Sequence, residues 1–472
     1  MEAINTTVPE KGIYAMTMLT QIPADVQVSK TISAFMKRFE IGKLLKLCNG
    51  YKEKGVPAVR LFLFMLQKVF ADRSMYMQMK TGRWQEEFGK NTYYRFLNSA
   101  KINWERFTRL LAARIIREAI QPLTSEVRKD VFIVDDTLYR RTGYKKTELC
   151  ARVFDHTDMR YRKGFRALTL GWSDGNTFLP ISHRLLSSSK AENVLGPEPD
   201  LDGRTLAARR RKQARSKATD VMVTLLRDAL QAGIRAKYVL FDSWFSNPKQ
   251  ILELKEMGLD TIAMVKKSSK INYQWQGKAC NIKQIYSRNR KRPGRSRYLL
   301  SVIVTVGQNK EGMPIEAKIV CVRNRSNRKD WLAILSTDTS LSEEEIIRLY
   351  GKRWDIEVFF KTCKSYLKLL TECHSLSYDA LTAHTSIVLV RYMLLALEQR
   401  KSVDARSFGE LFMLVVDELA DITFSHSMQL ILAAMLDSIR ELFHANDEQI
   451  DMLMTAFLSR LPEEFQALLS AA

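Results

Sequence analysis

The segment Val131–Thr137 has the sequence VFIVDDT, a run of β-branched and aromatic residues that ends in two acids. Such a short apolar run, bounded by polar residues, predicts a buried β-strand. Two more strands are predicted after it, at Phe165–Trp172 and Thr177–Leu186, joined by the turn sequence SDGN. A further apolar run, Tyr238–Phe241, leads into Asp242. Two predicted strands therefore end in carboxylates.

Helical patterns surround these strands. Gly203–Gly233 predicts a helix with a strongly basic first half, Pro248–Gly258 predicts another, and Thr261–Val265 predicts a fifth strand. The order β-β-β-α-β-α-β indicates an α/β core with a mixed sheet. At 472 residues, the chain is expected to form two or three domains. We expect a helical N-terminal region at 1–125, a core at 126–375 with a β-rich insertion at 268–337, and an acidic helical region at 376–472.

The charge is large and uneven. The chain has 74 Lys and Arg against 52 Asp and Glu, a net charge of +22, and its 46% hydrophobic content excludes a disordered chain. This balance predicts a polyanionic partner, most often nucleic acid. Residues 266–330 hold 17 basic and 3 acidic residues, whereas residues 401–472 hold 4 and 12. The acidic tail is therefore better suited to protein contacts than to phosphates.

Other features of the sequence indicate the cellular compartment of the protein. The apolar stretch Ile387–Leu397 is interrupted by Arg391, so we expect no membrane-spanning helix and no membrane partner. The N-terminus lacks the pattern of a signal peptide. Six scattered cysteines without a CxxC pair are typical of reduced thiols in a cytosolic protein.

Acids at the ends of neighbouring strands indicate a metal site. Two carboxylates at one sheet edge repel each other unless a cation lies between them. Hard divalent cations such as Mg²⁺ prefer oxygen ligands and support phosphoryl transfer in pairs. The alternative for each acid alone is that it caps the next turn.

A third acid lies in residues 350–364, which have the sequence YGKRWDIEVFFKTCK. Tyr350, Arg353, Glu357 and Lys364 are spaced by close to whole helical turns, so they are predicted to line one helix face. An acid, two bases and a phenol on one face suit a phosphate-rich, metal-binding environment. The alternative is a solvated face with a Glu–Arg ion pair.

The spacing Y-x2-R-x3-E-x6-K resembles the signature of the insertion-sequence-four family of bacterial DDE transposases. The strands that lead into Asp135 and Asp242, and the β-rich insertion, fit this family too, over about residues 131–368. The resemblance implies an RNase H-like catalytic core with helical flanking regions. It also implies a transposase of the bacterial cytoplasm that cleaves and joins the DNA ends of an insertion sequence, with a DNA hairpin as one route open to it.

The resemblance implies Asp135, Asp242 and Glu357 as catalytic ligands of Mg²⁺, or of Mn²⁺. Tyr350, Arg353 and Lys364 would contact the phosphates of the DNA end. Neighbouring residues of a strand point to opposite faces, so only one of Asp135 and Asp136 is a ligand. The family pattern written as Asp-x-Thr selects Asp135, which we favour, and written as Asp-Thr it selects Asp136.

Further DNA contacts are expected. In hairpin-forming relatives an aromatic residue of the insertion stacks on a flipped base, and Trp331 occupies that place; the alternative is a strand core residue. The basic runs Arg204–Lys217, with Arg210 and Arg211, and Arg288–Arg297, with Arg292, are predicted to follow DNA phosphates; the alternative is a solvated basic face.

Two other classes of protein stay open at this point. A transposase-derived protein could bind DNA without catalysis, and a nuclease with the same core could cut without joining. Pairing of two DNA ends implies a homodimer, for which the acidic residues 401–472 are the expected contact. The alternative is that these helices only cover the core of their own chain.

Overall fold

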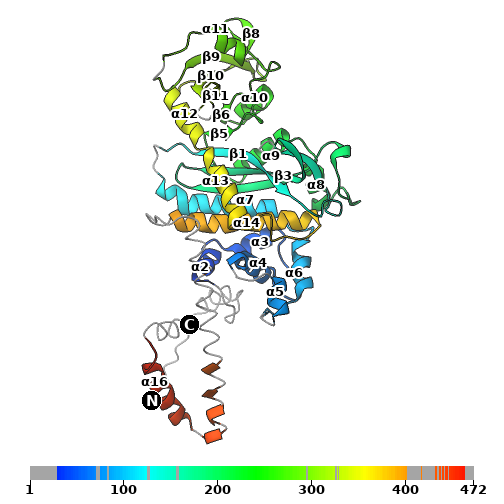
Figure 1. Cartoon of the computed structure of the whole chain (residues 1–472), viewed down its shortest axis with the longest axis vertical. Coiled ribbons are helices and arrows are strands. Elements are labelled where there is room, and N and C mark those ends of the chain that lie inside the picture. The colour runs from blue at the N-terminus through cyan, green and yellow to red at the C-terminus, as the bar shows by residue number, and fades with distance from the viewer. Residues whose placement is uncertain are drawn as a thin grey trace, which may run out of the picture. The chain divides into compact units, whose positions relative to one another are not determined.

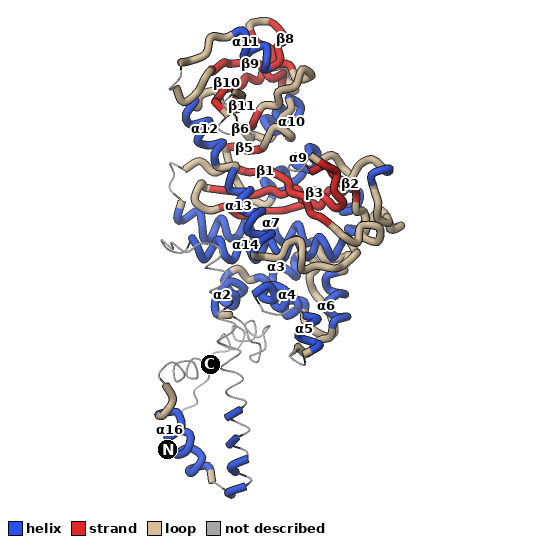
Figure 2. Tube along the Cα trace, in the orientation of Figure 1, coloured by secondary structure: helices blue, strands red, loops and turns tan. Residues whose placement is uncertain are grey.

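The computed structural model describes residues 29–70, 75–81, 84, 86–124, 128–155, 159–293, 296–324, 327, 329–400 and parts of 416–462 (Figures 1 and 2). The chain forms two compact units. The first comprises residues 1–42, 52–87 and 405–472, and the second comprises residues 43–51 and 88–404.

The first unit is helical where it is described. Its helices are α2 (Lys30–Arg38), α4 (Ala58–Gln67), α5 (Met75–Lys80) and α16 (Asp447–Ser459), and α3 (Ile41–Leu47) crosses the boundary between the units. Ser29 caps α2 by accepting a hydrogen bond from the Ile32 backbone N–H. Helix α4 buries almost its whole surface, which follows from its apolar sequence AVRLFLFMLQ. The helical periodicity predicted for the N-terminal region is confirmed.

The second unit is built on a mixed sheet whose central strand is β1 (Val131–Arg140). β3 (Arg160–Ser173) pairs antiparallel with β1, and β4 (Phe178–Leu186) pairs antiparallel with β3. β5 (Tyr238–Phe241) pairs parallel with β1, and β6 (Asp260–Met264) pairs parallel with β5. The order β4-β3-β1-β5-β6, with this mixture of directions, is that of an RNase H-like core. The predicted fold class is confirmed.

Two details of the core differ from the sequence prediction. β1 does not end at Val134 but continues through both acids, because its ladder with β3 extends to the pair Arg140–Gly164. A short strand, β2 (Ala151–Asp155), also pairs with the start of β3. Both acids therefore lie within a strand, and their side chains point to opposite faces.

Helices cover this sheet. α7 (Trp104–Ile115) and α14 (Tyr378–Arg400) pack on β4 and on each other, as Figures 1 and 2 show. By length and composition α14 could cross a membrane, but its whole apolar window is buried in the protein, as expected of a core helix. Apart from a helix in the insertion, the further α-helices described in the second unit are α6 (Lys90–Leu97), α8 (Leu206–Ala214), α9 (Ala218–Gln231), α10 (Pro248–Glu256), α12 (Glu343–Gly351) and α13 (Trp354–Ser365).

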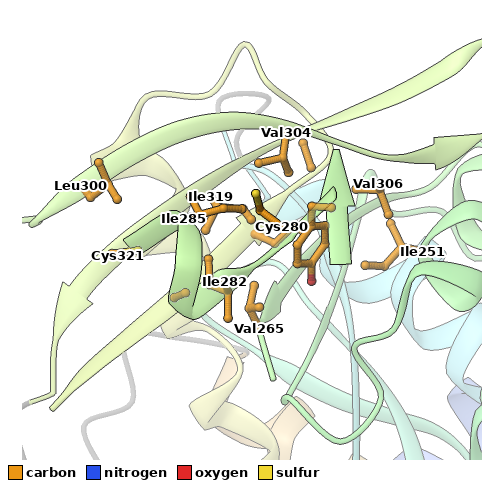
Figure 3. Packing of buried hydrophobic residues seen from close by; sticks show 14 residues of the cluster. Ile251, Val265, Cys280, Ile282, Ile285, Leu300, Val304, Val306, Ile319 and Cys321 are labelled. Carbon is orange, nitrogen blue, oxygen red and sulfur yellow. The ribbon is translucent and has the colours of Figure 1, made fainter. Parts of the chain in front are cut away.

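The predicted β-rich insertion continues the core sheet. It comprises β7 (Asn272–Trp275), β8 (Lys278–Asn281), α11 (Ile282–Arg288), β9 (Leu300–Gln308), β10 (Pro314–Arg323) and β11 (Trp331–Ser336). β11 pairs antiparallel with β6, so one hydrogen-bonded sheet runs from the core into the insertion. Its own apolar cluster holds α11 on the strands, and Figure 3 shows Ile282 and Ile285 gathered with Cys280 and Ile319.

Candidate active site

Three carboxylates reach one region of the second unit from three elements. Asp135 lies on β1, Asp242 directly follows β5, and Glu357 lies in the first turn of α13. β1 and β5 are parallel neighbours whose pairing includes Ile133 and Leu240, so Asp135 and Asp242, each two residues further on, come level at the carboxyl end of β5. Helix α13 packs on β1 and brings Glu357 to this end.

Arg353 joins two of these acids. Its Nη1 lies 2.9 Å from Asp135 Oδ2, and its Nη2 donates to Oε1 of Glu357, four residues further along the chain. Burial and the neighbouring charge of Asp242 raise the pKa of Asp135 to about 7, although Arg353 opposes this shift. Burial also raises the pKa of Asp242. Asp135 and Asp242 therefore lie in one electrostatic environment, and Arg353 connects Asp135 to Glu357.

The donor chemistry of these acids fits a hard divalent cation. Carboxylate oxygens are the ligands that Mg²⁺ and Mn²⁺ prefer. Among the residues that the structure describes, no three His, Cys, Asp or Glu side chains are grouped closely enough to form a ready-made metal site. The guanidinium of Arg353 bridges Asp135 and Glu357 instead, and supplies positive charge where a cation would bind.

Asp136 has a different environment from Asp135. Arg166 on β3 holds both of its oxygens, with its Nε on Oδ2 and its Nη2 2.7 Å from Oδ1. A bidentate pair of this kind satisfies the carboxylate with fixed geometry. Asp135, by contrast, faces α13, which also contacts β1 through Lys364, whose Nζ lies 2.5 Å from Oγ1 of Thr137. Asp136 is thus paired with Arg166, whereas Asp135 is paired with Arg353.

The predicted helix with four aligned residues is in fact two helices. α12 ends at Gly351 and α13 begins at Trp354, so Tyr350 and Glu357 lie on different helices. Gly351 weakens a continuous helix. Three of the four signature side chains nevertheless stay near one another, because Arg353 pairs with Glu357 and its guanidinium lies 5.9 Å from the Tyr350 ring centre. Burial raises the pKa of the Tyr350 hydroxyl to about 12.

Two residues inside the signature anchor α13, and the sequence analysis did not single them out. Lys352 Nζ donates to the backbone oxygen of Lys129 at 2.8 Å and to that of Asp174 at 3.3 Å. Asp355 accepts a hydrogen bond from the Ser173 hydroxyl at 2.9 Å. Both contacts fasten the start of α13 to the β3–β4 turn and to the segment before β1. Their only sequence signal is their position between the signature residues.

Arg210 and Arg211 are buried, whereas a DNA contact requires an exposed side chain. They are only 3% and 6% exposed. Arg210 pairs with Asp379 and donates to the backbone oxygen of Ile102, and Arg211 lies 2.9 Å from Asp379 and 2.6 Å from Glu148. The prediction that these two arginines contact DNA is therefore corrected: they neutralise buried carboxylates. The exposed basic residues of this segment are Arg204, Arg209, Lys212 and Lys217.

The two predicted DNA contacts of the insertion have different surroundings. Arg292 is exposed, with its guanidinium 4.2 Å from the Tyr298 ring centre, so its position agrees with a surface contact. The Trp331 ring is half-buried and stacks on Tyr286, with ring centres 4.0 Å apart and planes 10° apart. The ammonium of Lys267 lies 4.3 Å from its centre. This packing fits the alternative reading of Trp331 as a strand residue at the edge of the apolar cluster.

The chain is similar to known proteins both by family model and by structure. Residues 65–329, more than half of the chain, match a family model described as DDE superfamily endonuclease. The matched range includes Asp135 and Asp242 and ends before α12 and α13. No curated protein matches the chain. Among solved structures, a chain of the piggyBac transposase synaptic complex with hairpin DNA is similar, with a TM-score of 0.44 and 11% identity over 84% of this chain and 80% of that chain.

Proposed function

This chain belongs to the DDE superfamily endonucleases, and from that premise we propose that it is a DNA transposase. It would cleave and join the ends of a bacterial insertion sequence, as the resemblance to the insertion-sequence-four family implies. The observation that carries the proposal is the convergence of Asp135, Asp242 and Glu357 at one end of the sheet, with Arg353 bridging two of them.

The proposed metal ligands are Asp135, Asp242 and Glu357, with Mg²⁺ or Mn²⁺ as the cation. When bound, divalent cations supply Lewis-acid stabilisation to the attacking and leaving oxygens of a phosphodiester. These acids have defined positions in the fold, because Asp135 lies within β1, Asp242 directly follows β5 and Glu357 lies on α13. Half-buried carboxylates that lie beside each other repel, and a cation bound between them removes this repulsion.

The basic side chains of the site would hold the DNA. The planar guanidinium of Arg353 pairs with two carboxylates in this structure. A cation that neutralises those carboxylates would free the guanidinium to bind a phosphate. Lys364 and Tyr350, which lie on either side of it along the chain, would contact neighbouring phosphates. The exposed Arg292 and the N-terminal region at 1–125 would extend the contact along the DNA end.

Cation binding is expected to tighten as pH rises. Asp135 must lose its proton to act as a ligand, and its pKa of about 7 means that protons compete below neutrality. Apparent Mn²⁺ affinity should therefore increase roughly tenfold between about pH 6 and pH 8. Electron paramagnetic resonance of free Mn²⁺ measures this directly. Asp136→Asn should keep this dependence but shift it to lower pH, because the Asp136 charge helps to raise the pKa of Asp135. An affinity that is flat with pH would contradict the assignment of Asp135.

Cleavage of a labelled linear end tests the proposed function. With Mg²⁺ the protein should cut one strand and leave a 3′-hydroxyl, with no covalent protein–DNA adduct, and chelation should stop the reaction. Hairpin-length product on a denaturing gel would identify the hairpin branch. Cleavage without joining would instead identify a nuclease, and binding without cleavage would identify a non-catalytic DNA-binding protein. A covalent adduct would contradict the mechanism.

We also propose that the protein acts as a homodimer in the bacterial cytoplasm. Two DNA ends need two sites, and the acidic residues 401–472 would form the contact. Most of this segment lies outside the described residues. Light scattering of the complex with two DNA ends measures the number of protein chains.

A further inference from the structure

We propose that Trp244 stacks on a DNA base beside the scissile phosphate, and that Arg166 and Lys266 bind the phosphates that flank this base. The inference rests on the proposed function, because it places single-stranded or locally unpaired DNA at the carboxylates. It assigns the stacking role to an aromatic residue of the core, whereas the sequence resemblance had pointed to Trp331 of the insertion.

Trp244 is held directly beside a candidate catalytic acid. The chain leaves β5 at Asp242 and turns, and Oδ1 of Asp242 accepts a hydrogen bond from the Trp244 backbone N–H at 2.9 Å. The next residue, Phe245, is fully buried and packs against Phe241 of β5. This buried neighbour fixes the turn, while the Trp244 side chain itself stays 42% exposed. A large exposed indole at the rim of a carboxylate site suits binding to an apolar, planar group.

Two cationic side chains lie over the indole ring of Trp244. The Arg166 guanidinium lies 4.9 Å from the Trp244 ring centre, and the Lys266 ammonium lies 5.4 Å from it. Arg166 is fixed in place by both oxygens of Asp136, which gives that acid a structural role beside the site. Aromatic rings with cations close by bind unpaired nucleotides, because bases stack on the ring and phosphates pair with the charges.

Trp331 is less suited to this role. Its ring already stacks on Tyr286 in a nearly parallel arrangement, so one of its faces is covered. Two consecutive lysines connect Trp331 with Trp244, because Lys267 contacts Trp331 and Lys266 contacts Trp244. Aromatic and basic side chains thus extend from Asp242 towards the insertion, as a path for one DNA strand would require.

The stacking role of Trp244 is tested by equilibrium binding of a fluorescently labelled single-stranded oligonucleotide to the full-length protein. Binding is measured by fluorescence anisotropy without metal. Trp244→Ala should weaken binding about tenfold to a hundredfold, because one base loses its stacking partner. Trp244→Phe should restore most of the affinity. The matched control is Tyr161→Ala, which removes an exposed aromatic ring of β3 that packs on Phe154 and should leave binding unchanged.

A second measurement identifies the stacked base. An abasic nucleotide is moved along the oligonucleotide, and at one position wild-type binding should fall to the level of Trp244→Ala, with no further loss when both changes are combined. Wild-type affinity in Trp244→Ala, or losses that multiply at every position, would overturn the inference. This test does not depend on catalysis. Failure of the wild-type protein to cut DNA contradicts the proposed function, whereas unaltered binding by Trp244→Ala contradicts only the stacking role.

Discussion

Replacing Asp135 with Asn should lower single-turnover cleavage of a DNA end by at least about a thousandfold, while Asp136→Asn should keep at least about a tenth of the activity. The two neighbouring acids have different surroundings. Asp135 faces Arg353 and the charge of Asp242, whereas Asp136 is satisfied by a bidentate pair with Arg166. Loss of a ligand removes stabilisation of the transition state. Loss of the Arg166 pair only loosens a neighbouring side chain.

Gel-shift binding of the same DNA is the control for this pair. Both variants should bind the DNA end within a few-fold of the wild-type protein, because neither replacement removes a basic side chain. Asp242→Asn and Glu357→Gln should resemble Asp135→Asn. An inactive Asp136→Asn beside an active Asp135→Asn would reverse the ligand assignment.

Replacing Glu372 with Ala should reduce the free energy of unfolding by about 3–5 kcal/mol, because it leaves a buried arginine without its carboxylate. Arg391, in the middle of α14, is only 1% exposed, and its Nη1 and Nη2 lie 2.5 Å and 3.2 Å from the two Glu372 oxygens. His384 Nε2 lies 3.1 Å from the same carboxylate. Urea unfolding followed by circular dichroism at neutral pH measures the loss.

A matched control is Glu192→Ala, whose partner Lys190 is exposed and lies 3.9 Å away; its removal should change stability by less than about 1 kcal/mol. Equal urea midpoints for Glu372→Ala and the wild-type protein would contradict the role of the buried pair. The contribution also depends on pH. Burial alone would raise the pKa of Glu372, but Arg391 and His384 hold it well below the usual value of 4.5.

The direction of this pH dependence follows from the lowered pKa of Glu372. The stabilisation by Glu372 is fully present above its unfolded-state pKa, near 4.5, and is lost as pH falls through the lower folded-state pKa. The wild-type protein should therefore lose stability in acid more steeply than Glu372→Gln does. This comparison separates the ion pair from the packing of the side chain.

Much of the core could be predicted because its signals are local. Apolar runs such as Tyr238–Phe241 are long enough for a buried strand, and acids at their ends have few roles other than turns and ligands. Helical spacing correctly placed Arg353 and Glu357 together, since residues four apart share a helix face. The different surroundings of Asp135 and Asp136 could not be predicted from the sequence, because they depend on Arg166 from another strand.

The errors arose where partners are distant in sequence. The basic run of α8 has the composition of a DNA-binding surface, but Arg210 and Arg211 pair with Asp379, which comes from the start of α14. Nothing near Arg210 in the sequence indicates that acid. The break between α12 and α13 has a local cause instead, because Gly351 weakens a continuous helix.

The position of the bound cation tests the central claim most directly. Fe²⁺ can replace Mg²⁺ at sites of oxygen ligands, and with peroxide and ascorbate it cuts the polypeptide backbone nearby. Fragments of the full-length protein should end near Asp135, Asp242 and Glu357, and excess Mg²⁺ should suppress all three cuts together. Cuts at other positions, or cuts near only one of these acids that Mg²⁺ does not suppress, would contradict a shared metal site.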